Sequence, residues 1–187
     1  MPDSMDDASP ALHSPKGERT MAVNMHQISL PVFAKHLTGL ATCMKKAQSA
    51  YGEKKYDETT LLHYRLYPDM FSFSKQVQMA TDHARNFAGP LSGVPAPKFE
   101  DTEKSLGELI QRVEKTVAYL NTIKPEQIDG TEGKGVTIKR PTGDVEMKGI
   151  DLLLNRTMPN FMFHCTTAYD ILRHNGVELG KRDFMGG

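Results

Sequence analysis

Apolar side chains recur at intervals of three and four residues along most of the chain, which is the spacing of one face of an α-helix. This period predicts amphipathic helices over residues 27–50, 57–87, 102–123 and 150–174. Pro68 lies inside the second of these segments, where it removes an amide donor and crowds the preceding turn. We therefore expect that helix to be kinked or broken at Pro68.

The period changes in the segments that separate the predicted helices. Residues 89–97 read GPLSGVPAP, a run of helix breakers that predicts a linker. Within residues 130–149, apolar and polar side chains alternate around the sequence PTGD, which is typical of a β-hairpin. Because a lone hairpin is only marginally stable, we expect it to lie on the helices.

The two ends of the chain differ in composition. Residues 1–22 mix Pro, Ser, Asp and Gly without a period, so they are predicted to be a disordered extension. Residues 23–187 carry all the helical segments and are predicted to form one domain. The predicted fold class is all-α, a four-helix bundle with a small β-hairpin insertion before the last helix.

Charge and cysteine content exclude several classes of partner. The chain has 23 basic and 23 acidic residues, so it lacks the cationic surface of a nucleic-acid-binding protein. No apolar run approaches the roughly 20 residues that a bilayer crossing needs, and the acidic N-terminus is unlike a secretory signal. Cys43 and Cys165 have no CxxC partner. We expect a cytoplasmic protein with reduced cysteines that binds neither nucleic acid nor a membrane.

The second predicted helix carries a row of polar side chains at the edge of its apolar face. At about 100° per residue, the row occupies one narrow sector and consists of Arg65, Asp69, Gln76 and His83. Polar groups turned toward a core must bond to one another, to water or to a ligand. Two interpretations stay open: a structural Arg65–Asp69 ion pair beside Pro68, or the lining of a pocket.

The fourth predicted helix presents Asn160 and His164, four residues apart on one side. His164 falls within the edge of the apolar stripe, so it is either a core histidine with a satisfied hydrogen bond or a general base or metal ligand. It lies near the middle of its helix, level with Asp69 and Gln76 on a neighbouring second helix. A site centred on His164 is therefore expected to use Asp69, Gln76 and Asn160.

The histidines of the second helix are expected to lie farther away. Along a straight helix His63 and His83 would be about 30 Å apart, so they cannot bind one ion together, although a kink at Pro68 would shift their levels. One imidazole with a carboxylate and two amides is a poor zinc site, because zinc favours several His or Cys ligands. Such a set suits a weakly bound cation, a water or a polar small molecule.

Four sequence blocks resemble a known group of proteins, a domain-of-unknown-function family of uncharacterised small proteins. That family is similar to the DinB/YfiT-like four-helix bundles, which include metal-dependent thiol transferases and isomerases. The resemblance spans about residues 25–185 and implies a DinB-like bundle that can form a homodimer. The blocks are PVF at 31–33, RLYPDMFSFSKQVQMATDHA at 65–84, FEDTEKSL at 99–106 and PNFMFHCTTAYDILRHNGVELGKRDF at 159–184.

The resemblance also implies a place for a divalent metal. The superfamily's usual site has three histidines, one from the second helix and two from the last helix at the spacing HxxxH. Here His164 is the matched position, but Ala168 follows it at that spacing, and the second helix offers Asp69 or Gln76 at mid-height. We therefore expect the three-histidine site to be incomplete.

Two functional hypotheses follow from these residues. The first is a small-molecule-binding protein or enzyme whose polar pocket lies between the second and fourth helices. In that case His164 is the general base or acid, Asp69 orients it or holds a water, and the ligand-binding side chains are Arg65, Gln76 and Asn160. The alternative is a structural or interaction module, whose polar row is a satisfied network and whose helix faces form a homodimer.

Overall fold

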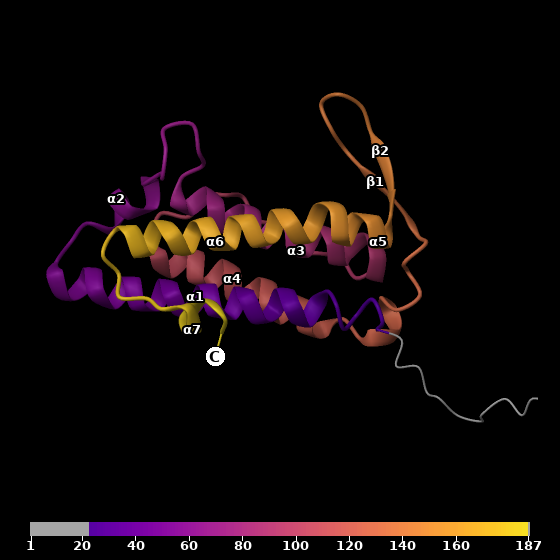
Figure 1. Ribbon diagram of the computed structural model, residues 1–187, viewed down its shortest axis with the longest axis horizontal. Coiled ribbons are helices and arrows are strands. Elements are labelled where there is room, and N and C mark those ends of the chain that lie inside the picture. The colour runs from indigo at the N-terminus through magenta and orange to yellow at the C-terminus, as the bar shows by residue number, and fades with distance from the viewer. Residues whose placement is uncertain (1–22, 187) are drawn as a thin grey trace, which may run out of the picture.

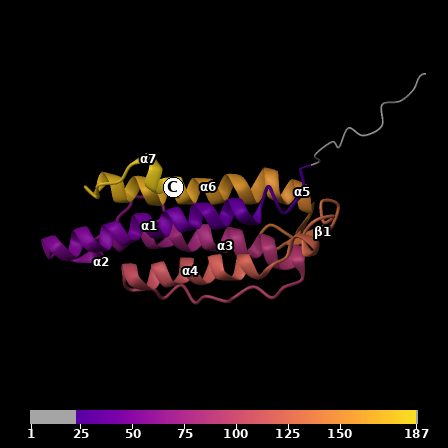
Figure 2. The same ribbon diagram turned by 90° about the horizontal axis from the view of Figure 1, so that it is seen from below.

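Four long helices lie lengthwise beside one another and form the body of the protein (Figures 1 and 2). The computed structural model describes residues 23–186, so the predicted extension over residues 1–22 lies outside the described residues. The predicted all-α bundle with a small hairpin is confirmed. The long helices are α1 (Leu30–Lys54), α3 (Phe73–Ser92), α4 (Leu106–Thr122) and α6 (Met158–His174).

The core lies along the centre of this bundle, where α1 packs chiefly on α4 and α3 packs chiefly on α6. Phe33 of α1 is fully buried and meets Phe87 of α3 and Phe161 of α6, with ring centroids 5.7 and 4.8 Å apart. Burial of each such ring contributes about 1.5–3 kcal/mol. Three of the four long helices thus meet at one aromatic cluster. No helix within residues 23–186 combines the length and the apolar character that a membrane crossing requires.

The predicted second helix is broken into two. Helix α2 (Glu58–His63) begins where the Asp57 carboxylate accepts a hydrogen bond from the Thr59 amide, at 2.9 Å. Residues 64–72 then leave the helix around Pro68, and the Phe73 amide donates to the Tyr64 carbonyl at 2.9 Å to start α3. The break expected at Pro68 is therefore present, and it separates α2 from α3 by a loop.

Helix α3 continues through Pro90, so the linker predicted over residues 89–97 begins later, at Gly93. Gly93 has φ +76°, a left-handed conformation that ends the helix. The Lys134 ammonium donates to the carbonyl oxygens of Pro90 and Leu91, at 2.7 and 3.0 Å. These hydrogen bonds satisfy carbonyls at the end of the helix, which have no partner within it.

The hairpin joins the end of α4 to the last helix. After the short turn η1 (Pro125–Gln127), strands β1 (Gly135–Ile138) and β2 (Val145–Lys148) pair antiparallel, with Val136 opposite Met147. Val136 is buried, so the base of the hairpin packs on the bundle as expected, whereas its tip projects away from the helices (Figure 1).

The last predicted helix, over residues 150–174, is one continuous run with a wide turn inside it. It consists of α5 (Gly149–Leu152), a π-helical turn η2 (Leu153–Thr157) and α6. The Met158 amide bonds to the Leu153 carbonyl, five residues back instead of four. Pro159 follows immediately. A proline ring in a regular helix clashes with the carbonyl four residues earlier, and the widened turn relieves this clash.

The chain ends by folding back on the bundle. Gly176, with φ +81°, stops α6 in a left-handed conformation, and the short helix α7 (Lys181–Phe184) then packs on α1. A Cβ atom at Gly39 of α1 would lie 2.5 Å from the Phe184 carbonyl oxygen. Glycine at position 39 is thus what permits α7 to approach α1 so closely.

Candidate functional site

His164 of α6 and Gln76 of α3 form a buried hydrogen-bonded pair. Nδ1 of His164 lies 2.7 Å from Oε1 of Gln76, and the two residues are 6% and 1% exposed. The Gln76 amide nitrogen donates to the Phe71 carbonyl at 3.2 Å, which turns Oε1 toward the histidine. Because Oε1 can only accept, His164 carries its proton on Nδ1 and presents an unprotonated Nε2. The pair that the sequence placed at one level is therefore brought together.

A second histidine, His83 at the middle of α3, stacks on His164. The two ring centroids are 5.5 Å apart, with 14° between the ring planes. Nε2 of His83 is enclosed by protein without a hydrogen-bond partner, and within residues 23–186 only His36 Nδ1 shares that state. A buried polar atom without a partner costs about 1–3 kcal/mol, so it marks a place where strain or a missing ligand requires an explanation.

Both rings of this pair are neutral near neutral pH. Burial lowers the pKa of His164 to about 4, and the nearby His83 lowers it further as a second cause. Burial also lowers the pKa of His83, with a smaller contribution from the charge of Arg156 that Asp82 opposes. The two imidazoles are thus held as proton acceptors.

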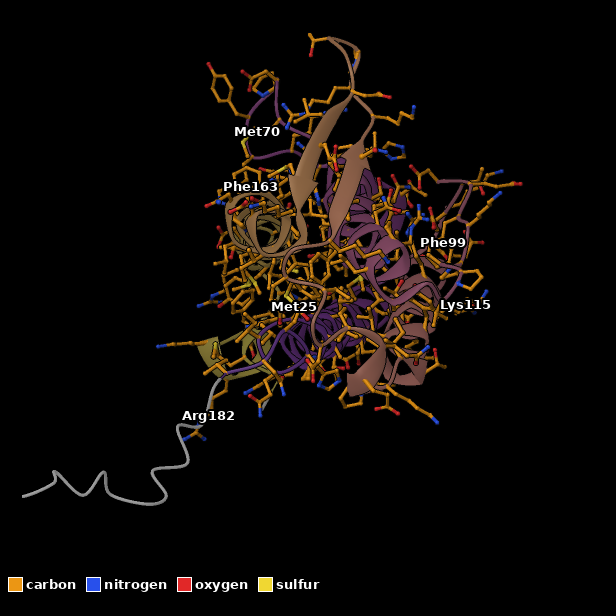
Figure 3. The ribbon with its side chains drawn as sticks, turned by 90° about the vertical axis from the view of Figure 1, so that its right-hand side faces the viewer. Met25, Met70, Phe99, Lys115, Phe163 and Arg182 are labelled. Carbon is orange, nitrogen blue, oxygen red and sulfur yellow. The ribbon has the colours of Figure 1, made fainter. Side chains whose placement is uncertain are left out.

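His83 also lines a hollow of about 470 Å³ between α3, β1 and the π turn. Figure 3, which views the molecule from the end where α5 begins, shows the two strands rising over α6 and α3 above this region. The lining combines three basic residues and one acidic residue with mainly apolar walls. The lining residues are Met79, Asp82, His83, Arg85, Asn86, Phe87, Pro90, Ala96, Val136, Thr137, Ile138, Lys139, Leu152, Arg156 and Thr157.

Arg112 of α4 anchors the acidic member of this lining. Its guanidinium is buried and donates to the carboxylates of Asp82, Asp101 and Glu103 at 2.7, 2.7 and 2.8 Å. It also lies 4.5 Å from the ring centroid of Phe99. Burial is the largest single influence on the pKa of Glu103 and would raise it, but the hydrogen bonds from Arg112 and Gln78, a backbone hydrogen bond and the charge of Arg112 together lower it below its ordinary value. Arg112 therefore fixes the linker after α3 against both α3 and α4, a role that sequence reasoning missed.

Arg65 and Asp69 do not belong to this site, which corrects the prediction of a polar row on one helix. Both are exposed in the loop over residues 64–72. The predicted Arg65–Asp69 ion pair is absent, and Nη1 of Arg65 donates to the Met70 carbonyl instead. Because the chain leaves the helix after His63, side chains four residues apart no longer share a face. Neither residue lines the hollow beside His83.

The remaining predicted residue, Asn160, bonds within its own helix. Its Nδ2 donates to the Arg156 carbonyl at 2.7 Å, one turn earlier in the same helical run. His83, which the sequence placed far from His164, stacks on it because the break at Pro68 moves the start of α3 to Phe73. Because of this shift, His83 lies near the middle of α3, the helix that packs on α6, whereas Asp69 lies before α3 begins.

The side chains at the site do not fit the three-ligand metal centre of the superfamily. Within the part of the chain that the structure describes, no group of three or more His, Cys, Asp or Glu side chains could hold a metal ion. His83 and His164 supply two imidazoles, and the adjacent Gln76 amide is already engaged. Burial raises the pKa of Cys43 to about 11 and raises that of Cys165 as well, so neither offers a thiolate ligand.

Comparison with known proteins supports the fold and the family. A family described as Domain of unknown function (DUF1993) matches residues 25–185. A crystal structure of a DinB family member protein from Shewanella denitrificans is similar, with 36% sequence identity, 87% of this chain and 92% of that chain covered, and a TM-score of 0.77. No curated protein matches the chain.

Proposed function

We propose that this chain, which belongs to the DUF1993 family and shares the fold of a DinB family member, binds a small molecule in the hollow between α3, β1 and the π turn. The observation that carries this proposal is His83, a neutral ring that lines the hollow while its Nε2 has no partner. Such atoms are few in native proteins, and a ligand that supplies the hydrogen bond is one explanation for them. A hollow of about 470 Å³ is in the size range of small-molecule sites.

The proposed roles of the two histidines follow from their environments. His83 lines the hollow, and a small shift of its ring toward the hollow would let the enclosed Nε2 accept a hydrogen bond or a proton from the ligand. His164 would act as its support, because Gln76 fixes the His164 ring and the stacked imidazole keeps His83 in place. Proton abstraction from a bound substrate is the chemistry that this arrangement supports best. His83 would then be the general base, the role that sequence analysis assigned to His164.

The proposal is tested by NMR of protein labelled with ¹⁵N-histidine, titrated with a collection of small aromatic acids, amides and alcohols. We expect some of these compounds to shift the ring signals of His83 saturably and to leave those of the exposed His63 unchanged. Met79→Trp, which fills the hollow from α3, should abolish the shifts while the far-ultraviolet circular dichroism stays native. Absence of any shift at His83, or shifts that survive Met79→Trp, would refute the proposal.

A second candidate function, a homodimeric interaction module, is favoured by exposed aromatic side chains beside His164. Phe71 and Phe163 are 46% and 54% exposed, and their rings flank that of His164 with centroids 6.3 and 5.3 Å away. Tyr67 in the same loop is 66% exposed. Such a group of apolar side chains is typical of a contact surface. Sedimentation velocity of the wild type and of Phe163→Glu tests this candidate, since a dimer through this surface should dissociate in the variant.

A further inference from the structure

One basic residue of the hollow has no partner for its charge. Arg156, in the π turn, is half-buried, and among residues 23–186 no carboxylate lies within ion-pair distance of it and its guanidinium donates no hydrogen bond. The other basic residues of the lining are engaged. Arg85 donates to Asp82 and to the Pro97 carbonyl, both at 2.9 Å, and Lys139 donates to Asp144 at 2.6 Å. Arg156 thus keeps five donors free at the hollow.

The local backbone holds Arg156 at this place. The widened turn before Pro159 carries Arg156, and the Asn160 side chain bonds to the Arg156 carbonyl at 2.7 Å. Arg156 lies close enough to His83 for its positive charge to lower the pKa of that histidine, as the second cause after burial. An unpaired guanidinium and an imidazole whose Nε2 lacks a partner therefore both line the hollow. π turns of this kind recur at functional sites.

The rest of the lining indicates the charge and polarity of a suitable ligand. The single acidic residue, Asp82, is neutralised by Arg112 at 2.7 Å and by Arg85, so it does not cancel the charge of Arg156. The hollow also has apolar side chains in its lining, which would take a hydrocarbon or aromatic body. These apolar side chains include Phe87, Val136, Ile138 and Leu152.

We propose that the hollow binds a small oxyanion, a carboxylate or phosphate ester with an apolar body, whose charged oxygens pair with the Arg156 guanidinium while His83 faces the adjoining atoms. This inference rests on the proposed function and names the class of its ligand. Guanidinium is suited to such a partner, because its planar fork matches the two oxygens of a carboxylate or phosphate. An anion there would also stabilise the protonated form of the neighbouring His83.

The inference is tested with three probes that share a phenyl ring, namely benzoate, phenyl phosphate and the neutral benzamide, by calorimetric titration and by the His83 ring signals. We expect benzoate or phenyl phosphate to bind about tenfold or more tightly than benzamide, as a charge-assisted hydrogen bond allows. Arg156→Gln should remove this preference and leave benzamide binding unchanged. Arg173→Gln, a matched change at an exposed arginine of the same helical run, should leave the preference intact.

The outcomes separate this inference from the proposed function. If benzamide binds as tightly as both anions, or if Arg156→Gln keeps the preference for the anion, then the oxyanion inference is wrong while small-molecule binding stands. If none of the three probes binds and no compound of the wider collection shifts His83, then the proposed function itself fails. Whichever of benzoate and phenyl phosphate binds more tightly identifies the anionic group. Retained benzamide binding in Arg156→Gln shows that the hollow is still folded.

Discussion

Acidification should destabilise this protein through His164, by an amount that the structure allows to be estimated. In the unfolded chain the ring takes up a proton near its ordinary pKa of 6.5, whereas in the folded protein burial delays protonation to a pKa of about 4. Between these values the unfolded state binds more protons, so the free energy of unfolding falls as the pH falls. At about 1.4 kcal/mol for each pKa unit, the full loss is about 3 kcal/mol. The contribution is complete above pH 6.5 and is lost by about pH 4.

The assay is urea unfolding, followed by circular dichroism at a series of pH values, for the wild type and for His164→Gln. His83 and His36 also have lowered pKa values and act in the same direction, but both remain in the variant. The difference between the two profiles therefore isolates His164. We expect the wild type to lose about 3 kcal/mol more than the variant on acidification, so the difference between the two curves should change by that amount between about pH 6.5 and pH 4. His63→Gln, at an exposed histidine, is the control. Parallel profiles for the wild type and His164→Gln would refute the reasoning.

Three further substitutions test the packing around the site by urea unfolding. Gln76→Leu removes the acceptor of the His164 Nδ1 proton, and the buried donor left behind should cost about 1–3 kcal/mol; no loss would contradict the tautomer inferred for His164. Arg112→Met leaves carboxylates such as Glu103 without their buried partner and should cost about 3–5 kcal/mol, whereas a loss under about 1 kcal/mol would mean that the linker is fixed by other contacts. Phe33→Ala opens a cavity at the aromatic cluster and should cost about 3–5 kcal/mol, and a loss under about 1 kcal/mol would show that the cluster is not central to the core.

The sequence predicted those parts of the fold that depend on local periodicity. The helical faces, the hairpin and the stop at Gly176 all follow from neighbours in the chain. The contact between Gln76 and His164 could also be anticipated, because each is a polar residue at the edge of an apolar stripe and must find a partner.

The remaining features depend on contacts that no local pattern encodes. Pro68 indicated a break, but the length of the loop that follows decides which residue of α3 lies beside His164, and this brings in His83 in place of Asp69. Arg112 looks like an ordinary charged helix residue until the linker folds over it. The position of Arg156 depends on the widened turn over residues 153–157. Pro159 is compatible with such a turn, but its presence in the sequence does not predict one.

That widened turn constrains how the chain can change in length. It holds one residue more than an α-helical turn, so deleting a residue from 153–157 would restore regular winding and rotate everything before it by about 100° about the helix axis. The hairpin comes just before this point and would be carried away from α3. Deletions and insertions should therefore be excluded from this short segment among related sequences, although the exposed tip of the hairpin can accept them.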